Sequence, residues 1–145
     1  MELSFFPYVQ LLHSKVIHFP IALFLGAMGM ETLSLTFKKE RLHRTALDMY
    51  ILATVITPFV VITGLQEAEH LHLGHPVLTI HKNFGLLTMW TSLISLPILW
   101  IVNKQNSKIF RVMFLVFLLI IATFVTVTGH NGGRMVYEYG VGVDQ

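Results

Sequence analysis

The sequence contains no cysteine among its 145 residues. This absence excludes disulfides, cysteine-ligated iron–sulfur clusters, thiolate copper centres and the covalent attachment of c-type haem. Any metal or cofactor would therefore be held by nitrogen, oxygen or thioether ligands.

Charge is also scarce in this chain. Only 12% of the residues are charged and 54% are hydrophobic, and the mean hydropathy of +0.66 lies outside the usual range of soluble domains. Four apolar stretches have the ~20 residues that a transmembrane helix needs, and they span about residues 17–37, 47–66, 82–102 and 109–129. Because the connections are short, the sequence predicts an all-α integral membrane protein, a single up-down-up-down four-helix transmembrane bundle over residues 1–145.

The segment after the last apolar stretch, residues 130–145, is rich in glycine. Because Gly132 and Gly133 favour a turn over a continued helix, we expect the last helix to end near residue 129. The remainder would form a periplasmic C-terminal tail over the mouth of the bundle.

Basic residues are distributed unequally along the chain. Of the ten Lys and Arg residues, seven lie in or next to the connections that follow the first and third apolar stretches. The positive-inside rule places those connections in the cytoplasm and both termini on the periplasmic side of a bacterial inner membrane. The basic loops then face anionic headgroups of the lipid bilayer, so the positive charge does not call for nucleic acid as a partner.

Histidine is concentrated at one face of this predicted bundle. Seven of the eight histidines lie on the outer side, and His18, His81, His130 and His70 place one at the outer end of each helix. At helical spacing, the first three share a stripe with small or hydroxyl-bearing residues, which are typical of faces packed against protein or a ligand. These are Ala22, Gly29 and Thr32 for His18; Gly85, Thr88, Ser92 and Ser95 for His81; and Ala122, Thr123 and Thr126 for His130.

The other ionisable residues are expected to have structural or interfacial roles. We expect His13 and His43 to face headgroups and water, and His72 and His75 to lie in a solvated loop. Glu31 is an intramembrane carboxylate and hence a functional candidate, although an ion pair with Lys38, Arg111 or another inner-leaflet base is the expected arrangement.

Haem b is the cofactor that this pattern favours. Paired imidazoles on facing helices ligate its iron, and small residues allow the flat ring to approach the backbone. We expect His18 and His81 to be the axial pair, with His130 and His70 as a second pair or as replacements, and Arg134 to bind a propionate. The alternative is a transition metal such as zinc or copper, bound by the histidine-rich loop together with Glu67 or Glu69.

Two stretches of the sequence resemble the signatures of a known family. "VIHFPIAL" at residues 16–23 and "GHNGGRMVYEYGVGV" at residues 129–143 are similar to the opening and closing motifs of the bacterial four-helix membrane family catalogued as domain of unknown function 2231. The resemblance implies the four-helix fold and a role for His18 and His81. Family members often have His-Pro where this chain has His13-Ser14. Some relatives are joined to cytochrome c-like segments, which suits electron transfer.

Together these patterns predict a haem b-binding, cytochrome b-like subunit of the inner membrane. It would pass electrons near the periplasmic face, between quinol or other membrane subunits and a cytochrome c-type carrier, within a larger complex. Two alternatives remain open: a histidine-ligated metal-dependent membrane enzyme or metal handler, and a cofactor-free accessory subunit. The sequence does not decide whether the protein is an enzyme.

Overall fold

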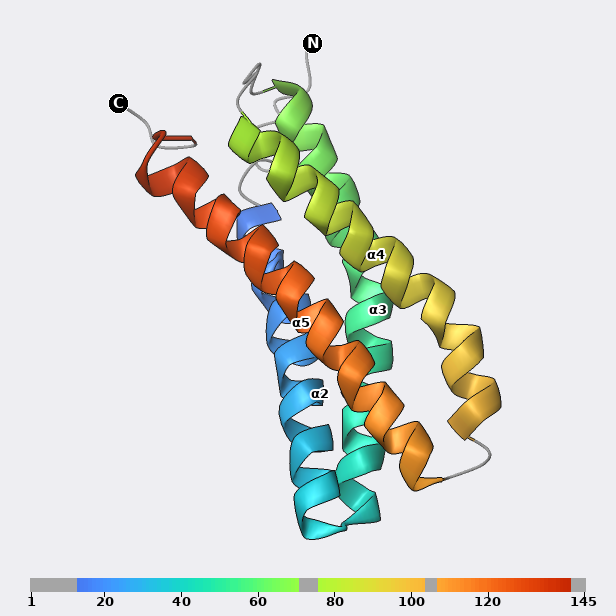
Figure 1. Ribbon diagram of the computed structural model, residues 1–145. Coiled ribbons are helices and arrows are strands. Elements are labelled where there is room, and N and C mark those ends of the chain that lie inside the picture. Colours follow the sequence, from blue (N-terminus) through green and yellow to red (C-terminus); the bar gives the residue numbers. More distant parts are fainter. Residues whose placement is uncertain (1–12, 71–75, 104–106, 142–145) are drawn as a thin grey trace.

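Residues 13–70, 76–103 and 107–141 are described by the computed structural model, without the side chains of residues 70 and 101–103. This part of the chain is all-helical and forms α2 (His18–Phe37), α3 (Glu40–His70), α4 (Pro76–Asn103) and α5 (Lys108–Tyr137) (Figure 1). A helical turn at residues 13–16 directly precedes α2. Each of the four helices is long and apolar enough to cross a membrane, which confirms the predicted fold class.

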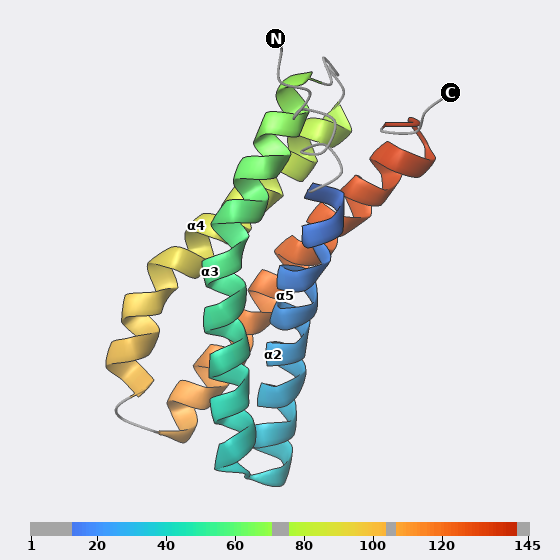
Figure 2. The same cartoon turned by 180° about the vertical axis from the view of Figure 1, so that it is seen from behind.

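Successive helices alternate in direction, so each end of the bundle collects residues from all four (Figures 1 and 2). Helix α2 packs against α3 and α5, and α4 packs against the same two helices. Helices α2 and α4 are therefore diagonal. We call the end that carries His13, His81 and His130 the histidine end, and the end with the α2–α3 and α4–α5 connections the basic end.

The α2–α3 connection is shorter than we expected, because α3 begins at Glu40 rather than near residue 47. Lys38 adopts the left-handed conformation with φ of 53°, and its backbone N–H donates to the Ser34 carbonyl. This cap reverses the chain within two residues. The basic segment that follows is polar but consists largely of good helix formers, so α3 starts at once.

The last helix is longer than predicted, and the turn that we expected at Gly132 and Gly133 is wrong. Helix α5 continues through both glycines to Tyr137. A glycine inside a helix costs about 1 kcal/mol, and packing of the helix outweighs that cost here. Helices α3 and α4 are also extended at the histidine end, to His70 and from Pro76, where proline is favourable at a helix start.

The bundle has an apolar core and also an apolar outer surface, as membrane proteins do. A hydrophobic cluster that includes Phe24, Tyr50, Phe114 and Leu118 fills the centre. Large apolar side chains such as Trp90 are exposed on the outside, where lipid tails replace water as the solvent. Buried hydroxyl groups donate to carbonyls of their own helix, as Thr54 does to Tyr50 at 2.9 Å. The outer surface is therefore suited to contact with the lipid bilayer.

Candidate functional site

Two histidines from diagonal helices meet at the histidine end of the bundle. His13 lies in the turn before α2, and His81 lies in the second turn of α4. Their ring centroids are 6.3 Å apart and the ring planes are nearly perpendicular, at 85°. Both side chains are partly buried.

Backbone carbonyl groups fix both rings through the same nitrogen. Nδ1 of His81 lies 2.8 Å from the Thr128 carbonyl oxygen, and Nδ1 of His13 lies 3.0 Å from that of Val60. A carbonyl oxygen only accepts hydrogen bonds, so each Nδ1 must carry the proton and donate. In the neutral imidazole, Nε2 then has the free lone pair. Metal-ligating histidines use this arrangement, in which a bond on one nitrogen orients the other.

Glycines provide the space that these rings occupy. A Cβ atom added to Gly64 of α3 would lie 2.6 Å from Cε1 of His13, which is closer than atoms can approach. A Cβ atom on Gly132 of α5 would lie 3.2 Å from Cε1 of His81. With Val60 and Thr128 supplying the carbonyls, α3, α4, α5 and the turn before α2 all contribute to the histidine pair. The glycines of α5 that we expected to end the helix instead allow a close approach.

The structure differs from our expectations for His18 and His130. Both side chains are exposed, and neither has a hydrogen bond or ring contact to another histidine among the described residues. The expected burial of their stripes is wrong for Ala22, Thr32, Thr123 and Thr126, which are exposed, whereas Gly29 is partly buried and Ala122 is buried. Threonine at these positions donates to its own helix, as Thr32 does to the Met28 carbonyl at 2.8 Å. A threonine stripe can therefore face lipid without an unsatisfied donor.

The His81 stripe is buried as predicted at Thr88, Ser92 and Ser95, and Gly85 is partly buried. His13, in contrast, contacts the interior rather than the headgroups where we expect it from the sequence. His13 and His18 are five residues apart, which is about 140° around a helix, so they face different directions. Two features bring His13 into the interior. The helical turn at residues 13–16 directs its side chain toward α3, and Gly64 of α3 leaves room for its ring.

The remaining predicted ligands do not join the histidine pair in the part of the chain that the structure describes. The side chain of His70 lies outside the described residues, as do His72 and His75. Arg134 pairs with Glu138, with 2.9 Å between Nε and Oε2. Glu67 is partly buried and Glu69 is exposed. Within residues 13–70, 76–103 and 107–141, no group of three His, Cys, Asp or Glu side chains is arranged to hold a metal ion.

A second polar pair lies toward the basic end. Glu31 of α2 and His43 of α3 are 0% and 1% exposed, and Oε2 of Glu31 lies 2.6 Å from Nδ1 of His43. Glu31 therefore pairs with another base at this end of the bundle, as one of the expected arrangements has it. The two partners expected by name, Lys38 and Arg111, are wrong, and Arg111 pairs with Glu40 instead. The expected exposure of His43 is wrong as well. The early start of α3 places His43 inside the bundle, opposite Glu31.

Aromatic rings flank this second pair, and each partner also has one polar atom without a hydrogen bond. Oε1 of Glu31 and Nε2 of His43 are buried without a hydrogen-bond partner. The rings of Phe110 and Phe114 contact His43 edge-on. Breaking such a pair would leave a buried polar group unsatisfied, so registers of α2 against α3 that separate Glu31 from His43 are disfavoured.

Comparison with known proteins identifies the family but no activity. No significant match is found among curated proteins or solved structures. A family model described as "Predicted membrane protein (DUF2231)" matches residues 10–145, which include both histidines of the pair and all four helices. The chain therefore belongs to this family of predicted membrane proteins.

Proposed function

We propose that the protein is a haem b-binding electron-transfer subunit whose axial ligands are His81 and His13. The observation that carries the proposal is the hydrogen bond that the two rings share in kind, from Nδ1 to a backbone carbonyl. Each Nδ1 is held by a carbonyl oxygen, so each Nε2 has the lone pair that a metal requires. His81 is the ligand expected from the sequence, whereas His13 takes the place that the sequence gives to His18.

The separation of the rings fits ligation of one metal ion from opposite sides. With a metal–nitrogen bond of about 2.0–2.1 Å, the value for imidazole on zinc, and a ring centre about 1 Å behind Nε2, two opposed ligands have centroids about 6 Å apart. The centroids of His13 and His81 are 6.3 Å apart. The pair therefore has a spacing compatible with two axial imidazoles.

The number of ligands favours haem over a bare metal ion. Haem iron is satisfied by one or two protein ligands, whereas zinc sites use three or four. Two imidazoles meet here, and the described residues contain no group of three potential ligands. Gly64 and Gly132 lie against the two rings with no side-chain bulk, which suits the close approach of a flat macrocycle.

A bound haem would supply one-electron transfer, and the protein would position and enclose it. Its own residues hold the imidazoles by backbone hydrogen bonds and surround them with apolar helices. Near the periplasmic face of a bacterial inner membrane, such a site would exchange electrons with membrane quinol, other membrane subunits or a cytochrome c-type carrier. A small four-helix chain of this kind would work inside a larger complex.

The test is the absorption spectrum of the purified protein and of four single variants. His13→Ala and His81→Ala should each abolish or shift the reduced Soret and α bands. His18→Ala and His130→Ala remove exposed imidazoles and should leave the bands unchanged, so they serve as matched controls. Loss of the bands in His18→Ala alone would return the ligand role to His18. A bound transition metal without these bands would favour the metal-handling alternative. The absence of both the metal and the bands would favour a cofactor-free subunit.

A further inference from the structure

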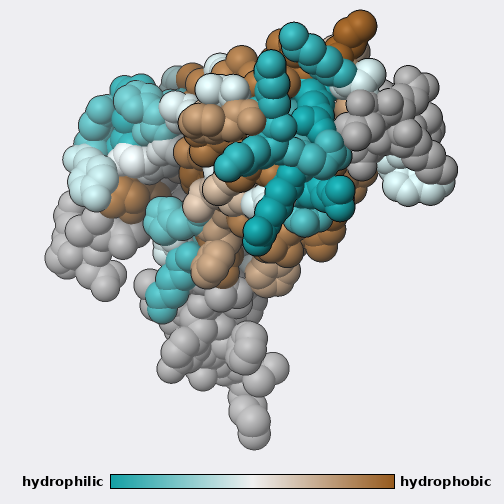
Figure 3. All heavy atoms as spheres, turned by 90° about the horizontal axis from the view of Figure 1, so that it is seen from below, coloured by the Kyte–Doolittle hydropathy of each residue, from teal (hydrophilic) through white to brown (hydrophobic). Residues whose placement is uncertain are grey.

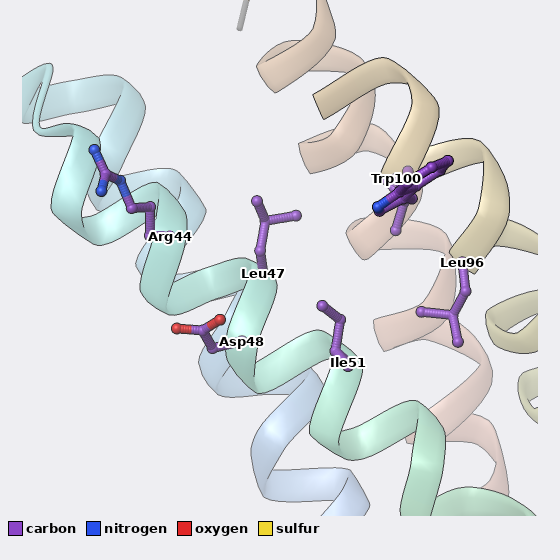
Figure 4. A pocket seen from close by; sticks show the side chains of 7 residues that line it. Arg44, Leu47, Asp48, Ile51, Leu96 and Trp100 are labelled. Carbon is purple, nitrogen blue, oxygen red and sulfur yellow. The ribbon is translucent and has the colours of Figure 1, made fainter. Parts of the chain in front are cut away.

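A groove runs between α3 and α4 near the basic end of the bundle. Its walls are apolar, with Leu47 and Ile51 from α3 and Leu96 and Leu99 from α4, and its volume is about 260 Å³. Figure 4 shows Leu47 and Ile51 extending from α3 and the indole of Trp100 extending from α4 toward α3. Arg44 and Asp48 of α3 complete the lining.

The groove exists because α4 leaves the side of α3. The two helices lie side by side near the histidine end and diverge toward the basic end (Figures 1 and 2). Pro97 lies inside α4, between the two leucines that line the groove. Proline lacks the backbone N–H and clashes with the carbonyl of the preceding turn, which bends a helix.

The depth of the groove matches the boundary between headgroups and lipid tails. Arg44 lies in the second turn of α3, and Ile51 lies about 10 Å deeper at ~1.5 Å per residue. Trp100 lies near the end of α4, and tryptophan is enriched at this level of membrane proteins. A ligand that filled the groove would therefore have an apolar part beside the leucines and a polar part beside Arg44.

Charge at this end favours an anionic polar part. Figure 3 views the molecule from this end and shows hydrophilic side chains gathered there. Basic residues outnumber acidic ones among the described side chains nearby: Lys38, Lys39, Arg41, Arg44, Lys108 and Arg111 stand against Glu40 and Asp48. Glu40 is already paired with Arg111. Asp48 lies one turn deeper than Arg44, so an anion is favoured on the Arg44 side of the groove.

We propose that this groove binds an anionic glycerophospholipid of the adjacent leaflet. Its phosphate group would lie beside Arg44, and the first part of one acyl chain would lie along Leu47, Ile51, Leu96 and Leu99. The volume is below the ~300–1,000 Å³ of typical enclosed ligand pockets, so it suits a headgroup and part of a chain better than a separate small molecule. Basic pockets between helices at the cytoplasmic side are recognised lipid sites. This site is at the opposite end from the histidine pair and does not depend on haem.

The two tryptophans of the chain allow a direct measurement. In the Trp90→Phe variant of the full chain, Trp100 is the one remaining tryptophan and lines the groove. The variant is reconstituted in vesicles of phosphatidylcholine and phosphatidylglycerol, with one lipid at a time carrying brominated chains that quench fluorescence. We expect phosphatidylglycerol to be preferred over phosphatidylcholine at Trp100 by about fivefold, the effect of one basic residue near the surface.

Two further substitutions in the same background separate the groove from the general charge of this end. Arg44→Gln should reduce the preference to near one, whereas Arg41→Gln, which removes an exposed charge outside the groove, should leave most of it. Far-UV circular dichroism checks that all variants keep their helices. Equal quenching by both lipids in the Trp90→Phe variant would overturn the proposal. An equal loss in Arg44→Gln and Arg41→Gln, or no quenching by either lipid, would overturn it as well.

Discussion

Breaking the buried Glu31–His43 pair should cost far more stability than its single hydrogen bond suggests. His43→Leu removes the partner of a carboxylate that is 0% exposed. An uncompensated buried charge costs about 3–5 kcal/mol. Glu31→Leu removes the buried carboxylate and leaves an imidazole nitrogen without its partner, so its cost is the smaller penalty of about 1–3 kcal/mol for an unsatisfied polar group.

The double variant is the decisive member of this series. Replacing both partners with leucine removes every buried polar atom of the pair, including the two that lack partners. Buried ion pairs that are replaced by apolar residues of similar size are often neutral or stabilising. The loss in the double variant should therefore be smaller than the sum of the single losses by at least about 2 kcal/mol.

Reversible unfolding in mixed micelles of increasing SDS content, followed by far-UV circular dichroism, measures these free energies. Glu40→Gln is the matched control, because it breaks the more exposed Glu40–Arg111 pair, in which the glutamate is 43% exposed. That change should cost no more than about 1 kcal/mol. If the losses of Glu31→Leu and His43→Leu are instead additive in the double variant, the two residues do not act as a pair.

Four further predictions follow from individual contacts and from the charge distribution. Gly64→Ala adds a Cβ atom 2.6 Å from His13, so it should displace that ring and weaken the haem bands. Gly29→Ala, whose Cβ meets nothing within 4 Å, should spare the bands and stabilise the protein by about 0.5–1 kcal/mol in SDS unfolding. Tyr50→Phe removes the 2.7 Å hydrogen bond to Ser95 and should cost about 0.5–1.5 kcal/mol in the same assay. A phosphatase that folds only in the periplasm should be active when fused to the C-terminus, and an inactive fusion with an active cytoplasmic reporter would reverse the orientation.

Composition and periodicity were sufficient to predict the four spans and the position of His81. Long apolar runs separated by short polar links leave few alternatives to a helical bundle in a membrane. The stripe of small residues after His81 is buried as that spacing predicts. The threonines of the similar stripes beside His18 and His130 are exposed, which lipid tolerates because each hydroxyl bonds to its own helix.

The two polar pairs were not predictable, because each depends on the register of one helix against another. His13 precedes the apolar stretch, and sequence hydropathy does not show that the helix begins so early. Glu31 meets His43 only because the connection at Lys38 is a tight left-handed cap and α3 starts directly after it. Turn geometry and packing set the register of two helices, and hydrophobic patterning does not predict either of them.

The measurement that tests the central claim most directly is the reduced-minus-oxidised absorption spectrum of the wild-type protein, purified from membranes in mild detergent. If His13 and His81 ligate haem, the protein should copurify with haem b and show sharp reduced Soret and α bands. A protein with full helix content, expressed with ample haem supply, that shows no such bands would contradict the account.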